Sequence, residues 1–179
     1  MQRTQTRRLV LAAATGIMTL GLVLPASAAT SGVTPTSLDV TAGALSITVP
    51  TAPVNLGATV NSVVGSTIVG ALGVVRVEDA RGAPAGSSWV ATAISTAFTP
   101  AGATIAASLV GYTAGPITQA GTAVYTANNP THLEGAIAVV TASGITGVNS
   151  ATWNPNIDIR VPGGAIVGNY TGTITHSVT

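Results

Sequence analysis

The sequence predicts an all-β protein, an antiparallel Ig-like or Greek-key β-sandwich of about eight to ten short strands. Apolar and polar residues alternate with period two in several segments, which is typical of strands with one buried face. The chain contains 21 glycines and 10 prolines, and beyond position 28 no segment has the i, i+3, i+4 apolar spacing of a long helix. Turn residues separate the alternating segments at short intervals, which favours a sandwich or barrel over a mixed fold.

Residues 1–28 have the pattern of a secretory signal peptide. Basic residues precede the apolar run 9–24, and the small residues Ala26 and Ala28 predict cleavage after position 28. A retained membrane anchor is the weaker alternative, because the run is short for a membrane span. The pair Arg7 and Arg8 leaves the twin-arginine route open beside the general secretory route. We therefore expect a secreted, extracellular protein with no membrane segment after processing.

Removal of the signal changes the charge of the chain. Three arginines then face five acidic residues, a net charge of −2, and lysine is absent. This balance excludes a nucleic-acid binder, which needs a basic surface. Cysteine is also absent, so neither disulfides nor a lipid on cysteine can hold or anchor the protein. The remaining chain is long enough for one domain with its own core.

The first predicted elements follow a small, polar leader at 29–37. Alternating segments at 38–41 and 45–49 predict two half-buried strands, the first of which begins a domain over 38–179. The glycine-interrupted apolar segments 54–60 and 63–69 predict two further short strands, and a helical turn is an alternative for the second.

The stretch 72–98 predicts a complete hairpin. Val75 and Val77 alternate with charged neighbours, as in a strand with one solvent-exposed face. The segment 82–88 is rich in Gly, Pro and Ser and predicts the loop. The apolar segment 89–94, which begins with Trp89, predicts the return strand.

Four more strands are predicted towards the C-terminus. Segments 105–112 and 136–141 are apolar and are separated by glycines and the turn at 128–130. Segments 157–161 and 170–178 show the clearest alternation in the chain, with Thr and Ser on one face of the last strand.

The central stretch resembles the WxL-type domains of secreted surface proteins in Gram-positive bacteria. The resemblance lies in a strand ending in V-x-D-x-R-G, a short loop and a strand led by tryptophan; the matching residues are Val77, Asp79, Arg81, Gly82 and Trp89. The run 161–178 is similar to the closing strand of that family. The chain departs from the family at both name-giving tripeptides, with Trp-Val-Ala at 89–91 and His-Ser-Val at 176–178.

The resemblance implies a non-catalytic cell-surface protein that associates non-covalently with the bacterial cell wall, through peptidoglycan or another cell-wall glycan. It also implies adhesion within complexes of other exported surface proteins. The alternative is a structural or adhesive subunit that binds another surface or host protein by edge-strand pairing. The chain ends without a sorting motif, so we expect no covalent wall attachment.

Four residues are candidates for binding. Trp89 and Trp153 can either pack in the core or form an exposed platform that stacks on sugars. Asp79 and Arg81 can either form a charge pair that fixes the loop before Trp89 or contact a ligand directly.

The remaining polar residues give no support for catalysis. His132 and Glu134 form an H-x-E pattern, but no cysteine pair completes a zinc site, so we expect a surface loop, no metal and no cofactor. His176 lies on the apolar face of the last strand, where a packed imidazole is expected rather than a ligand or pH-sensing group. No Ser, His and Asp arrangement has local support, so we predict that the protein is not an enzyme.

Overall fold

The computed structural model describes residues 31–100 and 102–179. The predicted signal peptide lies outside the described residues. The chain divides into two units, Met1–Asp39 and Val40–Thr179, and every described strand belongs to the second. No helix among the described residues is long and apolar enough to cross a membrane.

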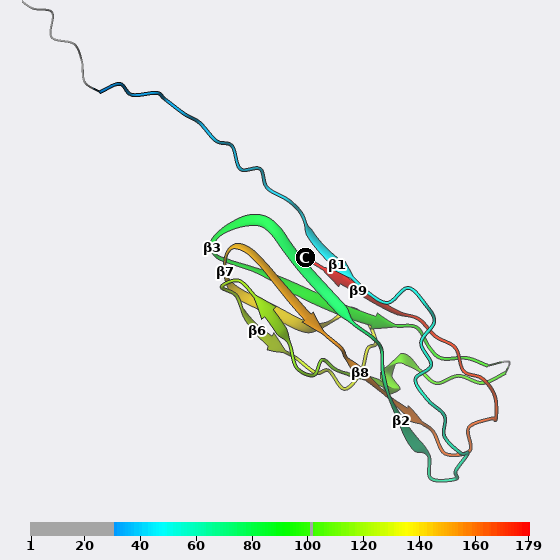
Figure 1. Cartoon of the computed structure of the whole chain (residues 1–179). Helices are drawn as coiled ribbons and strands as arrows, with labels where there is room; N and C mark the ends of the chain where they lie inside the picture. The colour runs from blue at the N-terminus through cyan, green and yellow to red at the C-terminus, as the bar shows by residue number, and fades with distance from the viewer. Residues whose placement is uncertain (1–30, 101) are drawn as a thin grey trace, which may run out of the picture. The chain divides into compact units, whose positions relative to one another are not determined.

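The described residues form an all-β structure of nine strands with antiparallel pairing and one turn of 3₁₀ helix (Figure 1). In chain order the elements are β1 (Leu45–Thr48), β2 (Ser66–Ala71), β3 (Val75–Ser95), η1 (Ala107–Leu109), β4 (Val110–Thr113), β5 (Thr118–Ala120), β6 (Val124–Ala127), β7 (Ile137–Trp153), β8 (Asn156–Val161) and β9 (Ile174–Val178). One sheet has six strands around β3 and β7, and the other has three in the order β2-β8-β4.

The long strands β3 and β7 form one antiparallel ladder that bends in its middle. Val75 pairs with Trp153 near one end, and Ala93 pairs with Ile137 at the other. Between these ends the register shifts repeatedly, as it does at β-bulges. Gly82 occupies the left-handed region at a φ of 63°, which glycine adopts without steric cost. Figure 1 shows β3 curving back on itself at this bend.

The bend divides the large sheet into two halves. The first half-sheet contains β1, β3 at 75–79, the end of β7 at 149–153, and β5. The second half-sheet contains β9, β3 at 89–95, the start of β7 at 137–143, and β6.

The two half-sheets share one hydrophobic core. It contains the largest fully buried side chains, among them Trp89 from the second half-sheet and Trp153 from the first. The hydroxyl of Tyr125 on β6 donates to the carbonyl of Ser150 on β7, 3.1 Å away, and so joins the halves directly. This arrangement is consistent with a β-sandwich.

The predicted hairpin at 72–98 is wrong, although both of its arms are strands. Each arm pairs with β7, and the two arms do not pair with each other. The residues of 82–88 do not end the strand, because positive φ angles at Gly82 and Gly86 let the backbone turn while the ladder continues.

Two other predicted strands are absent. Segments 38–41 and 54–60 form no strand. Leu38 and Val40 are 88% and 89% exposed, so their alternation is not used to build a buried face. Alternation in sequence cannot say whether a neighbouring strand is present to pair with the segment.

Several boundaries differ from the prediction. The segment 63–69 overlaps β2, so the helical-turn alternative is wrong. The segment 105–112 is divided between η1 and β4, and 136–141 is only the first part of β7. The short strands β5 and β6 are not predicted by the sequence. The predicted strands at 45–49 and 157–161 are confirmed by β1 and β8. The strand predicted at 170–178 is confirmed only over β9, because 170–173 form no strand beyond an isolated bridge between Thr99 and Thr171.

Candidate binding surfaces

Asp79 and Arg81 form a charge pair at the bend of β3. The Asp79 carboxylate is fully buried and accepts hydrogen bonds from Nε and Nη2 of Arg81, at 2.9 and 2.8 Å. The hydrogen bonds from Arg81 hold the pKa of the Asp79 carboxyl below its usual value. Arg81 Nη2 also donates to the carbonyl of Ser88 across the bend. The pair therefore links the two ends of the bend immediately before Trp89. This is the first of the two alternatives given for Asp79 and Arg81, a charge pair that fixes the segment before Trp89.

The two tryptophans lie in the core. Trp89 is 1% exposed and its ring packs against Tyr125, with ring centroids 5.6 Å apart. Trp153 is 2% exposed, and its indole Nε1 donates to the hydroxyl of Tyr112 over 2.7 Å. Neither indole is available in this structure to stack on a sugar, because burial leaves no ring face in solvent.

A chain of polar side chains continues from Trp153 through the core. The hydroxyl of Tyr112 on β4 lies 3.2 Å from Nε2 of His176 on β9, and the two rings meet edge to face. Burial lowers the pKa of His176 to about 4 and raises the pKa of Tyr112. His176 is thus a packed, neutral imidazole at neutral pH that joins the second half-sheet to the small sheet.

Asn149 holds in place a second connection between the half-sheets, the one from β5 to β6. Nothing in the sequence pattern predicts this role. Its side chain is buried, and its Oδ1 accepts hydrogen bonds from the backbone N–H groups of Thr122 and Ala123. Between β5 and β6, Gly121 has a φ of 98°, and any side chain there would collide with Asn149. The amide therefore fixes the short connection that carries the chain from one half-sheet to the other.

The outer face of the second half-sheet carries a flat array of hydroxyl groups, here called the hydroxyl face. The pairing places Ser177 beside Thr92, and Thr141 beside Thr126. Six side chains with hydroxyls define it across four strands: Thr92, Thr126, Thr141, Ser143, Thr175 and Ser177. Apolar side chains lie between them, including Ile94 and Val124. This face contains no acidic or basic side chain.

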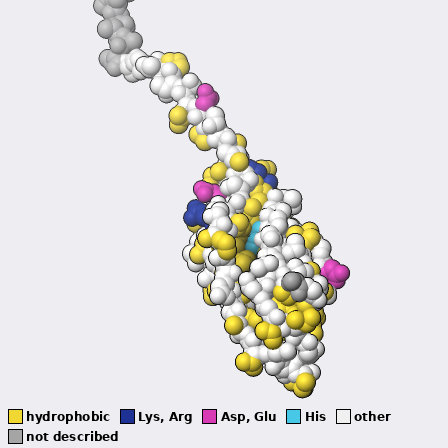
Figure 2. All heavy atoms as spheres, turned by 90° about the vertical axis from the view of Figure 1, so that its right-hand side faces the viewer, with side chains coloured by type: hydrophobic (Ala, Val, Ile, Leu, Met, Phe, Trp, Pro, Cys, Tyr) yellow, Lys and Arg dark blue, Asp and Glu magenta, His cyan; other side chains and the backbone are white. Residues whose placement is uncertain are grey.

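The outer face of the first half-sheet has a different character. Arg76 and Glu78 lie on it as an exposed pair 3.5 Å apart. Figure 2 shows how few acidic and basic side chains are visible on one face of the molecule, where white and hydrophobic side chains predominate. The hydroxyl face therefore differs in charge from the outer face of the first half-sheet, while both outer faces carry threonine.

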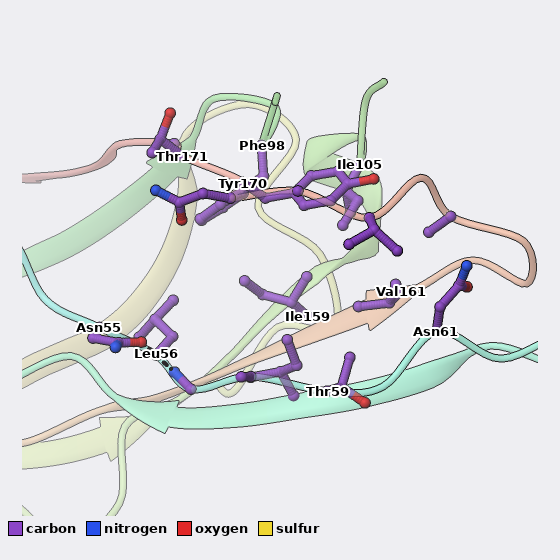
Figure 3. Close-up of a pocket in the computed structure, with 18 of the residues that line it drawn as sticks. Asn55, Leu56, Thr59, Asn61, Phe98, Ile105, Ile159, Val161, Tyr170 and Thr171 are labelled. Carbon is purple, nitrogen blue, oxygen red and sulfur yellow. Dashed lines mark hydrogen bonds between the residues drawn. The ribbon is translucent and has the colours of Figure 1, made fainter. Parts of the chain in front are cut away.

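The described residues form a groove of about 1110 Å³, here called the end groove. Its two walls are the segments 53–61 and 165–172, and its floor includes Ile159 and Val161 of β8 (Figure 3). Phe98 and Ile105 close one side. The polar lining consists of amide and hydroxyl groups, and no charged side chain lines it. Sequence reasoning missed this groove, because the walls are loops whose path the alternation pattern does not predict.

The remaining candidates do not assemble into a site. His132 and Glu134 are exposed in the loop before β7, as predicted. Within residues 31–100 and 102–179, no group of three or more His, Cys, Asp or Glu side chains could hold a metal ion.

Comparison with known proteins gives no relative: no protein-family model, no curated protein and no solved structure matches this chain.

Proposed function

We propose that this protein is a secreted, non-catalytic module that associates non-covalently with the bacterial cell wall, with the hydroxyl face as the surface that contacts peptidoglycan glycan. The WxL-type resemblance at 77–89 and the signal-peptide pattern at 1–28 supply the expectation of a cell-surface location. The observation that favours this function most is the uncharged hydroxyl array across four paired strands.

The chemistry of the hydroxyl face suits a neutral polysaccharide. Each Thr or Ser hydroxyl can donate one hydrogen bond and accept others, as sugar hydroxyls do. Neighbouring strands are about 4.8 Å apart, so the array offers many weak contacts at regular spacing rather than one deep pocket. Because none of these contacts is between charges, binding should depend little on ionic strength.

Co-sedimentation with isolated peptidoglycan tests the proposal. The exported protein should enter the pellet at both low and high salt. A double variant, Thr126→Val and Thr141→Val, removes two adjacent hydroxyls on the face while keeping β-branched side chains. We expect its bound fraction to fall several-fold, because each lost hydrogen bond is worth roughly 0.5–1.5 kcal/mol.

The matched control carries the same change on the outer face of the first half-sheet. Thr48→Val and Thr118→Val alter exposed strand residues of the first half-sheet and should bind as the unaltered protein does. Protein that stays in the supernatant, or equal binding by the two double variants, would contradict the proposal. A steep loss of binding with salt would point to charged wall polymers instead.

The second candidate is a structural or adhesive subunit joined to another protein by edge-strand pairing. Among the described strands, six pair with one neighbour each and so have a second edge: β1, β2, β4, β5, β6 and β9. Free strand edges are surfaces to which an extended chain can add.

A further inference from the structure

The walls of the end groove have backbone groups that the fold leaves unpaired. Among the described residues, no backbone N–H or C=O of 53–61 or of 166–170 bonds to another backbone group. The N–H of Gly57 bonds to the Asn55 side chain, and the Tyr170 hydroxyl donates to the Ile166 carbonyl. Most N–H and C=O groups of 53–61 and 166–170 therefore have no protein partner and can donate hydrogen bonds to an added strand or accept them from it.

The residues on the floor of the groove indicate which side chains such a strand would need. Figure 3 shows Ile159 and Val161 between Leu56 and Thr59 on one side and Phe98 and Tyr170 on the other. An apolar floor without charged lining favours an extended segment that presents alternate apolar side chains and no charge towards it.

The exposed segment 31–42, which continues the leader of 29–37 and is called the leader from here on, carries two alternating apolar residues of this kind, Leu38 and Val40. Val33, Leu38 and Val40 are 93%, 88% and 89% exposed, and no strand forms over 31–44. Leu38 and Val40 share one face of an extended chain, while the single charge, Asp39, points to the other. A strand over 33–41 would span about 30 Å. The wall 53–61 has the same number of residues.

We propose that the leader of one copy adds as a strand into the end groove of a second copy, so that the protein assembles head to tail. Leu38 and Val40 would cover the apolar floor, and the leader backbone would bond to the unpaired wall groups. The contact is heterologous, so its repetition builds a chain of copies rather than a closed pair. The end groove shares no residue with the hydroxyl face, so this proposal can fail while the wall-binding proposal stands.

Light scattering on the exported chain at increasing concentration tests the assembly. We expect its average mass to rise with concentration. A leader variant, Leu38→Asp with Val40→Asp, places charges on the side chains that would be buried. A groove variant, Val60→Asp with Val167→Asp, does the same at wall residues that are 83% and 85% exposed, where the fold should tolerate the change. Each should weaken self-association at least about tenfold.

Mixing the two variants gives the sharpest result. The leader variant keeps an intact groove and the groove variant keeps an intact leader, so the mixture should form a one-to-one dimer that cannot extend. The control, Val148→Asp, introduces a charge at an exposed valine of β7 outside both the groove and the hydroxyl face, and it should assemble as the unaltered protein does.

Three results would overturn the proposal. The unaltered chain could remain monomeric throughout the concentration range, the mixed variants could fail to form a dimer, or Val148→Asp could block assembly as strongly as the groove variant. If the chain is monomeric and its leader variant binds a synthetic peptide of residues 31–42, the first of these results means that the groove holds its own leader.

Discussion

At the scale of single residues, the bend of β3 depends on a carboxylate that is fully removed from solvent. Asp79 has one cationic partner, Arg81, whose own side chain is 37% exposed. A buried carboxylate that loses its partner carries its full desolvation cost. Loss of Arg81 should therefore lower the free energy of unfolding, although the Arg81 side chain itself is partly exposed.

Arg81→Ala should lower the free energy of unfolding by about 1 to 3 kcal/mol, because Asp79 would be left buried and unpaired. Urea melts at neutral pH measure the change. Arg76→Ala is the matched control, since it breaks the exposed pair with Glu78 and should cost less than about 1 kcal/mol. An unchanged midpoint for Arg81→Ala would remove the structural role of the pair.

His176 is a second residue whose burial predicts a measurable effect. Its pKa in the folded protein, about 4, lies below the value of about 6.5 expected in the unfolded chain. The unfolded chain therefore binds more protons between these values, and stability that is fully present above pH 6.5 is lost as the pH falls towards 4.

His176→Phe should flatten this dependence, by up to about 1.4 kcal/mol per pH unit, while keeping a ring against Tyr112. Unfolding free energies measured between pH 4 and 7 give the slope. His132→Phe replaces the other histidine at an exposed position and leaves the contact with Tyr112 in place. Equal slopes in the two variants would show that His176 does not carry the effect.

At the scale of elements, the structure differs from the sequence prediction mainly in which strands are partners. The alternation of β1, β8 and β9 is strong enough to predict them, because each has one face towards the core. The same pattern does not predict the bend of β3, because Gly, Pro and Ser are typical both of loops and of bulged strands. The sequence cannot distinguish a hairpin from a bent strand whose partner lies far along the chain.

The candidate residues divide in the same way. The pairing of Asp79 with Arg81 could be predicted, because the two residues are two positions apart. The burial of Trp89 and Trp153 was one of two open alternatives, and only the tertiary packing decides between them. The hydroxyl face and the end groove could not be predicted, because both depend on the pairing of distant segments.

The connection between β5 and β6, which carries the chain from the first half-sheet to the second, gives a prediction about stability. Gly121→Ala should destabilise the protein through both the positive φ and the collision with Asn149. Gly144→Ala is the control, because Gly144 also has a positive φ, 66°, but space around it for a side chain. Urea midpoints should therefore fall further for Gly121→Ala than for Gly144→Ala, and the reverse order would contradict the role of Asn149.

At the scale of the whole molecule, the proposed location at the cell surface depends on removal of the N-terminal segment. N-terminal sequencing of protein recovered from the culture medium or the cell wall should begin near Ala29, since the small residues before it form the predicted cleavage site. A mature protein that still begins at Met1 would contradict the signal-peptide prediction. The same preparation supplies the chain for the peptidoglycan and assembly experiments.

The ladder between β3 and β7 also bears on how the chain reaches its folded state. The segment that carries β4, β5 and β6 lies between the two long strands in sequence, and β5 and β6 have β7 as their partner. The central pairing therefore cannot form until β7 has been synthesised and is free to move. Such non-local pairing gives folding times of milliseconds to seconds, slower than in proteins dominated by local contacts. An unfinished chain would stay extended for longer, which suits the proposed secretion if the chain is exported by the general secretory route before it folds.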